Sequence, residues 1–168
     1  MPVYSDSDPS SSRNSPQSID FFIQHVATLL ARQSDQVLQE QLGVGLSQFK
    51  ILRTLEVNPR IQQRQIADLL GQTEASVSRQ IKLLKAKHMI ASAVNPINRR
   101  EHLTTLLPRG IRVLEAASDV LDQYHAPTLN TLSTKDQATL MRLLKVMHDQ
   151  MCALDGITGL THPGVAEH

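Results

Sequence analysis

The segment from Gln65 to Ile90, QIADLLGQTEASVSRQIKLLKAKHMI, constrains the fold more than any other part of the chain. It contains two stretches with apolar residues at helical spacing, separated by Gly71. Glycine readily adopts the left-handed conformation that ends many helices, and Thr73 offers a hydroxyl that can cap the next helix. The segment therefore predicts two short helices joined by a tight turn.

The second of these helices has two different faces. Val77, Ile81 and Leu84 recur at intervals of four and three residues, so they share one face, which we expect to be buried. The opposite face combines small side chains near the start of the helix with basic ones, which would allow close approach to a DNA groove. The residues on this opposite face are Ala75, Ser76, Ser78, Arg79 and Lys82.

Positive charge is concentrated in the middle of the chain, although the whole chain has a formal net charge of only +1. Residues 60–112 contain ten lysines and arginines and three acids, a net charge of +7. The remaining residues contain seven bases and thirteen acids, a net charge of −6. Localised positive charge favours polyanion binding more than the overall balance does. An ordinary solvated charged face is the alternative explanation.

The pattern changes after Ile90. The stretch ASAVNPINRREHLTTLL is rich in β-branched residues and threonine around the turn Asn95-Pro96-Ile97-Asn98. This predicts a β-hairpin with Arg99 and Arg100 near its tip.

Helices are predicted on both sides of this region, over Ser18 to about Gln41 and over Leu46–Glu56, and again after Pro108 and after Ser133. Pro127 is expected to kink or end the helix that Pro108 begins, and Ser133 with Asp136 resembles a capping box. The outer helices are too apolar to be solvated alone, so we expect them to pack against the same helices of a second chain.

Composition excludes several classes of protein. Hydrophobic residues make up 40% of the chain and charged residues 20%, as in an ordinary globular protein. The single cysteine, Cys152, rules out a disulfide within the chain and suggests the cytoplasm. No apolar run approaches the roughly 18 residues of a membrane helix. No phosphate loop, G-x-S-x-G or H-E-x-x-H motif is present, so an enzyme is not expected.

In order and spacing, these elements resemble the MarR family of bacterial transcription regulators. The resemblance runs from about Leu42 to Gly110 and is weaker in the flanking helices. LGVGLSQFKILRTL is similar to the second helix of the family, RQIADLLGQTEASVSRQIKLLKAKHMI to its helix-turn-helix, and NPINRREHLTTLLPRG to its wing and the start of its fifth helix.

The resemblance implies a mainly α-helical protein with a winged helix-turn-helix lobe and a helical dimerisation lobe. It implies a homodimer on pseudo-palindromic double-stranded DNA, with one helix in the major groove and the wing in the minor groove. A repressor controlled by a small effector, such as an aromatic compound, is expected, without a cofactor, metal or membrane partner. The residues expected to contact DNA are Arg64, Thr73, Ser76, Ser78, Arg79, Lys82, Arg99 and Arg100.

The domain boundaries follow from the same comparison. They are a disordered tail (1–17), a dimerisation helix (18–42), the winged helix-turn-helix (43–107), dimerisation helices (108–155) and a loose tail (156–168). The competing hypothesis is a winged helix that serves only as a protein-interaction module, which the basic face argues against.

Several positions depart from the family pattern. The wing reads Asn98-Arg99-Arg100, where Asp-Arg-Arg is usual, and His88 and Leu107 replace the usual Gly and Thr. Gln62 occupies a position where Ser or Thr often caps a helix, so weaker caps are expected, at roughly 1 kcal/mol each.

Two histidine signals remain. His148 and Cys152 are four residues apart on one predicted helix, which could supply two metal ligands, but two ligands do not complete a site. We therefore expect an incidental role for this pair. His25 and His125 are expected to be ordinary helix-face or interface residues, with a pocket between the lobes as the alternative.

Overall fold

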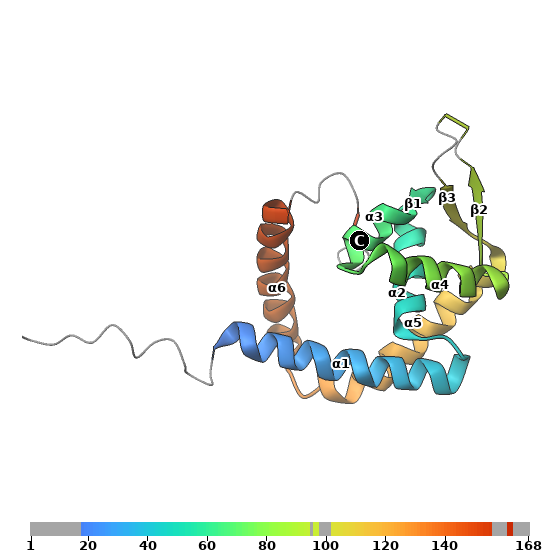
Figure 1. The fold of residues 1–168 in the computed structure, drawn as a ribbon. Helices are drawn as coiled ribbons and strands as arrows, with labels where there is room; N and C mark the ends of the chain where they lie inside the picture. Colours follow the sequence, from blue (N-terminus) through green and yellow to red (C-terminus); the bar gives the residue numbers. More distant parts are fainter. Residues whose placement is uncertain (1–17, 95, 98–101, 156–160, 163–168) are drawn as a thin grey trace, which may run out of the picture. The chain divides into compact units, whose positions relative to one another are not determined.

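The computed structural model describes residues 18–94, 96–97, 102–155 and 161–162. These residues fall into two compact units, which divide between Gln33 and Ser34, and each unit is described by itself. The elements in chain order are α1 (Ile19–Leu42), α2 (Leu46–Val57), β1 (Ile61–Gln62), α3 (Gln63–Leu70), α4 (Glu74–Ala86), β2 (Ile90–Val94), β3 (His102–Leu106), α5 (Pro108–Leu129) and α6 (Thr134–Asp155) (Figure 1).

The structure confirms the predicted fold class, a mainly helical chain with a β-hairpin. The two long strands pair antiparallel, with Ile90 opposite Leu106 and Val94 opposite His102. A third short strand was not predicted: β1 pairs with β3, which gives a three-stranded sheet in the order β1-β3-β2. Two residues are too few to produce an alternating sequence pattern, so this strand has no local signal.

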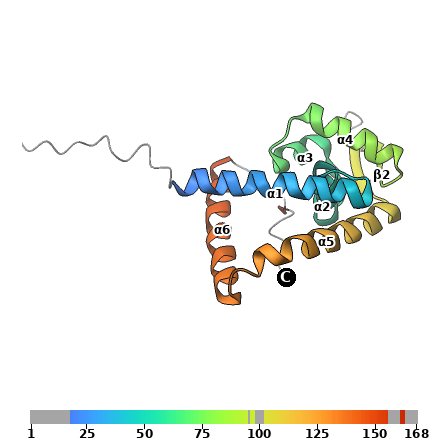
Figure 2. The same ribbon diagram turned by 90° about the horizontal axis from the view of Figure 1, so that it is seen from below.

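The larger unit is organised around α2. This helix contacts both α4 and α5 and lies between them, as Figure 2 shows. Aliphatic side chains from α2, α3, α4 and α5 form one core, and each fully buried Leu or Ile contributes about 1.5–3 kcal/mol. Fully buried members include Ile51, Leu52, Ile66, Val77, Leu84 and Leu114.

Most predicted helix boundaries agree with the structure, but one cap differs from the prediction. Pro127, which was expected to kink or end this helix, lies inside α5 two residues before its end at Leu129. Gln62 does cap α3: it forms a capping box with Gln65, whose side-chain oxygen accepts from the Gln62 backbone N–H at 3.1 Å.

The other caps form as expected. Pro108 is at the start of α5, where Leu107 provides no side-chain cap. Before α6, the Ser133 hydroxyl accepts from the Asp136 backbone N–H at 3.2 Å and donates to its carboxylate at 2.6 Å.

The smaller unit contains the first part of α1. Its apolar side chains are largely exposed, with Ile19 at 73%, Phe21 at 62% and Phe22 at 65%. In the larger unit, α6 likewise exposes a series of leucines and methionines, among them Leu140, Leu143, Leu144, Met147 and Met151. Within the described part of the chain, no helix is long and apolar enough to cross a membrane.

Candidate nucleic-acid interface

The turn between α3 and α4 has the geometry that the sequence predicted. Gly71 is left-handed, with φ +59°, and ends α3. The Gln72 backbone N–H then donates to the Ala67 carbonyl at 3.0 Å. Thr73 caps α4 by accepting the Ser76 backbone N–H at 3.2 Å. The start of α4 is therefore fixed by local hydrogen bonds.

Helix α4 is held by one face and exposes the other. Val77 and Leu84 are completely buried and Ile81 is nearly so. On the other side Ala75, Arg79 and Lys82 are exposed, as is Thr73 before the helix, while Ser76 and Ser78 are half-buried. The structure thus brings together five of the expected DNA-contacting residues: Thr73, Ser76, Ser78, Arg79 and Lys82.

The basic side chains of this face are available to an external partner. Among the described residues, neither Arg79 nor Lys82 forms an ion pair. Arg64 on α3 lies 3.9 Å from the carboxylate of Glu74 at the start of α4, with both side chains largely exposed. A long, exposed contact of this kind contributes little energy, so Arg64 can exchange Glu74 for another anion.

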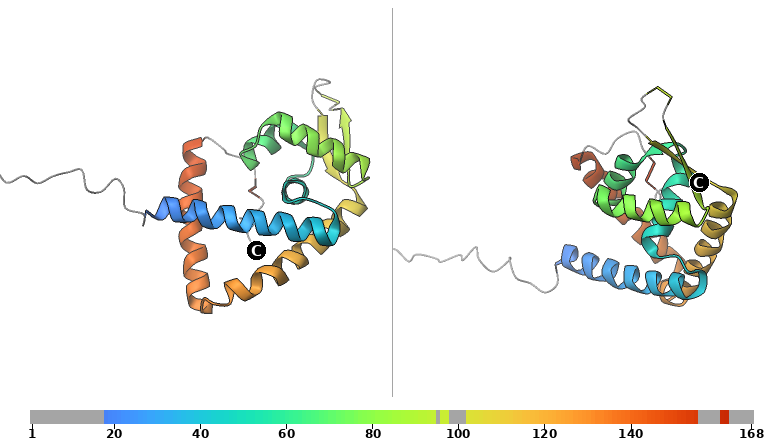
Figure 3. Two further views of the ribbon diagram at one scale, coloured as in Figure 1. Left: turned by 60° about the horizontal axis from the view of Figure 1, so that its bottom comes forward. Right: turned by 45° about the vertical axis from the view of Figure 1, so that its right-hand side comes forward.

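The hairpin of β2 and β3 projects away from the helices, past the C-terminal end of α4 (Figure 3). Ile97 in its turn is 94% exposed. Arg99 and Arg100, the two expected wing contacts, lie outside the described residues, as does Asn98. Their role stays a prediction.

The end of α4 is joined tightly to the start of α5. His88 is left-handed, with φ 53°, at the position where the family pattern has glycine. The next residue, Met89, is buried, and its carbonyl accepts the Leu107 backbone N–H at 2.9 Å. The same carbonyl lies so close to Gly110 that no side chain fits there. The position of α4 is therefore coupled to that of α5.

Three polar contacts, two from α2 and one from the connection before it, hold the region from α3 to the end of α4 and had no signal in the sequence. The Gln48 side chain donates to Gln80 Oε1 at 3.1 Å, and the Ser47 hydroxyl donates to Gln72 Oε1 at 3.3 Å. At the far end, Lys87 donates to the Gly43 carbonyl at 2.7 Å. These pairs are 25 to 44 residues apart, so no local pattern could reveal them.

The histidines of these two signals differ in the contacts that they make. Cys152 Sγ lies 3.4 Å from His148 Nε2, and His148 Nδ1 lies 3.1 Å from the Asp149 carboxylate. No group of three or more metal-binding side chains is found in the described ranges. In the larger unit, His125 hydrogen-bonds with the Ser34 hydroxyl at 2.9 Å. His25 belongs to the smaller unit, where its side chain is exposed.

The described C-terminal residues contact the end of α2. Asn58 binds the Thr161 backbone twice, accepting its N–H at 3.0 Å and donating to its carbonyl at 2.7 Å. The neighbouring His162 ring packs edge-on against His148 at 4.7 Å. Burial lowers the pKa of His162 below its ordinary value of 6.5, and the nearby His148 and Lys50 lower it further.

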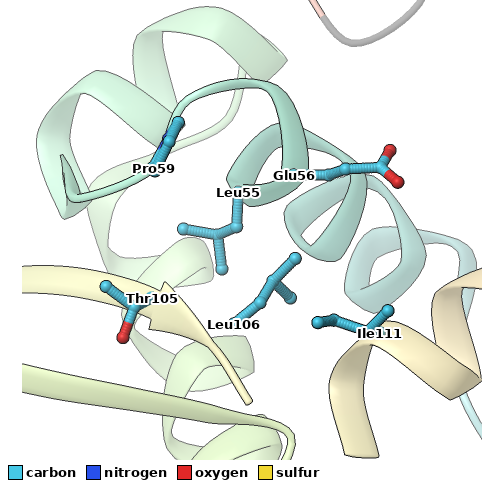
Figure 4. A pocket seen from close by; sticks show the side chains of 6 residues that line it. All are labelled: Leu55, Glu56, Pro59, Thr105, Leu106 and Ile111. Carbon is cyan, nitrogen blue, oxygen red and sulfur yellow. The ribbon is translucent and has the colours of Figure 1, made fainter. Parts of the chain in front are cut away.

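An open apolar groove of about 370 Å³ lies where α2, β3 and α5 meet (Figure 4). Leu55, Leu106 and Ile111 extend into it from the three elements, while the Glu56 carboxylate points away. Pro59 and Thr105 complete the lining. A small apolar molecule here would contact the wing and α5 together.

Comparison with known proteins agrees with this geometry. Residues 46–91 match the family model described as winged helix-turn-helix DNA-binding. No curated protein sequence matches the chain.

Among solved structures, the apo form of wild-type MarR from E. coli is 23% identical with a TM-score of 0.70, over 77% of this chain and 96% of that one. MepR from S. aureus, solved in complex with DNA, is 22% identical with a TM-score of 0.66, over 79% and 98%. BpsR from Bordetella bronchiseptica is 20% identical with a TM-score of 0.69, over 81% and 96%. These similarities establish the fold.

Proposed function

We propose that this chain, which has the fold of the MarR regulators, is a sequence-specific DNA-binding transcription regulator. The observation that carries the proposal is the exposed face of α4. The buried residues on the opposite side of α4 anchor the helix in the winged helix. Arg79 and Lys82 remain exposed and free of ion pairs among the described residues. This combination provides both a shape and a charge for a DNA groove.

The residues have different roles in this proposal. Arg79 contacts guanine in the major groove, because its guanidinium can donate two hydrogen bonds to O6 and N7. Lys82 and Arg64 contact phosphates, which fix the register of the protein on the duplex. Thr73, Ser76 and Ser78 line the same groove, and Arg99 and Arg100 reach the minor groove from the wing.

The solved neighbours support the DNA partner. MepR has been solved as a DNA complex, and a MarR variant as a complex with operator DNA. The BpsR structure concerns regulation of its DNA binding by 6-hydroxynicotinic acid. By analogy, we assign this chain a repressor function that a small effector relieves, acting in the cytoplasm without a cofactor or enzymatic activity.

A homodimer accounts for the exposed apolar surfaces. Phe21 and Phe22 on α1, and Leu143, Leu144 and Met147 on α6, expose large hydrophobic side chains that would be costly to leave solvated. A second copy supplies matching surfaces and a second α4. Two such helices about 34 Å apart reach successive major grooves and read a pseudo-palindromic site.

The apolar groove beside the wing is where we place the effector. A ligand there touches β3 and α5, so it can favour one position of the wing and of the helix that leads toward the dimer interface. Leu106→Arg would place a positively charged side chain in this groove. An effector that shifts the melting temperature of the wild type should lose that shift in the variant.

The test of the DNA-binding function is selection from a random-sequence duplex library with the purified full chain. The expected result is an inverted repeat bound by two protomers, with the dimer confirmed by light scattering. Arg53→Ala is the matched control for Arg79→Ala, because Arg53 lies on α2 and is already paired with Glu56 at 2.7 Å. If no sequence is enriched while the dimer is intact, the protein-interaction hypothesis replaces this one.

A further inference from the structure

Helix α4 carries one polar residue that its basic face does not explain. Gln80 is half-buried, and its Oε1 accepts a hydrogen bond from Gln48 Nε2 at 3.1 Å. Gln48 lies in the first turn of α2 and is only 6% exposed. The pair therefore connects the buried side of α2 with the side of α4 that borders its exposed face.

Gln48 is an unfavourable residue for the interior if packing alone is considered. Its Oε1 is fully buried and has no hydrogen-bond partner among the described residues. A buried acceptor without a partner loses its hydrogen bonds to water and gains none within the protein. A methionine would fill the same space without that penalty. Among the described residues, the only polar contact of the Gln48 side chain is its bond to Gln80, which indicates that Gln48 serves to place Gln80.

The Gln80 carboxamide keeps a donor and an acceptor available side by side. A carboxamide oxygen has two lone pairs, and Gln48 occupies one of them. Within the described part of the chain, Nε2 of Gln80 has no hydrogen-bond partner, and it is not among the buried unpaired atoms, so it reaches solvent. Adenine presents the complementary pair in the major groove, an N7 acceptor next to an N6 donor.

The position of Gln80 on α4 is compatible with such a contact. It follows Ser76 by four residues and Arg79 by one, so it lies one turn farther along the same side of the helix as Ser76. We propose that Gln80 reads an adenine in the major groove, and that Gln48 is a positioning residue that holds the Gln80 carboxamide in the reading orientation. The inference rests on the proposed DNA-binding function and adds a specificity-determining pair to it.

The experiment uses the full chain and the DNA site that it selects. Affinities are measured for that site and for variants with each base pair substituted in turn, at several salt concentrations. At one A·T pair in each half-site, the wild type should discriminate by roughly 5- to 150-fold. Gln80→Ala should reduce this discrimination to below about twofold at that pair alone. The slope of affinity against salt should not change, because no phosphate contact is lost.

Gln48→Met tests the positioning role. It should relax the preference at the same base pair while leaving the melting temperature unchanged or higher, which a purely structural residue would not do. Gln36→Ala is the control, because Gln36 is a glutamine on α1 whose side chain donates to Glu40, four residues along the same helix.

The results separate the possible failures. Unchanged base preference in Gln80→Ala overturns the reading role, and so does equal weakening on every sequence, which indicates a phosphate contact. If Gln80→Ala loses the base preference while Gln48→Met keeps it, the positioning role is overturned. If the wild type selects no sequence, the proposed function fails, and this inference fails with it.

Discussion

A side chain at Gly110 would collide with the backbone carbonyl of Met89. Gly110 is in the first turn of α5, and Met89 follows α4 by three residues, so this contact sets the distance between the two helices. The obstacle is backbone, which cannot move aside as a flexible side chain can. The winged helix is therefore joined to α5 by a contact that only glycine permits.

Gly110→Ala is expected to destabilise the chain by about 1–3 kcal/mol, as overpacking of a tight interior usually does. Gly45→Ala should cost less, because the nearest atoms there are side-chain ends of Gln39 and Asp35. Urea unfolding of both variants measures the difference. If both variants lose the same free energy of unfolding, the contact with Met89 is not what requires glycine at position 110.

His88 provides a test of backbone strain. Its φ of 53° is unfavourable for most residues, and its side chain is exposed, so few contacts depend on it. His88→Gly should raise the free energy of unfolding by up to about 1 kcal/mol. His88→Val should lower it by about 1 kcal/mol or more, since β-branched residues tolerate this conformation poorly. Thermal unfolding of the two variants should give melting-temperature shifts of opposite sign relative to the wild type.

Thr73 has a structural role that can be separated from any contact with DNA. Thr73→Ala removes the cap on Ser76 and should cost about 1 kcal/mol. Thr73→Ser keeps the hydroxyl and should be nearly neutral. If the serine variant loses as much stability as the alanine variant, capping is not what Thr73 contributes.

The contact of Thr161 and His162 with α2 should depend on pH. His162 has a lowered pKa in this position because of burial and the nearby His148 and Lys50, so the contact favours the neutral ring. It should therefore be intact above the ordinary value of 6.5 and weaken as the pH falls below it.

Nuclear magnetic resonance titration of the His162 ring measures this effect. Asn58→Ala removes both hydrogen bonds to Thr161 and should return the pKa of His162 toward 6.5. Identical titration curves in the wild type and the variant would contradict the coupling.

The sequence predicted those features that depend on neighbouring residues. The Gly71 turn, the Thr73 cap, the buried face of α4 and the box of Ser133 and Asp136 each follow from residues within a few positions of one another. For the same reason, helical spacing alone predicts which residues of α4 are exposed at the candidate site.

Long-range features could not be predicted in this way. The pairing of β1 with β3 and the Gln48–Gln80 bond join segments about 30 residues apart or more. The contact of Asn58 with Thr161 spans 103 residues. Partners at such distances are chosen by the packed fold, and a polar residue such as Gln48 has no pattern that marks it as buried.

The most direct test of the account is the salt dependence of DNA binding by the wild type, Arg79→Ala, Lys82→Ala and the control Arg53→Ala, measured by fluorescence anisotropy on the selected site. We predict a steep loss of wild-type affinity with salt. Lys82→Ala should reduce that slope by about 1, and Arg79→Ala should relax the preference at one G·C pair by roughly 5- to 150-fold. If all four proteins bind alike, with no sequence preference and the same slope, α4 is not the DNA-reading surface and the central claim is wrong.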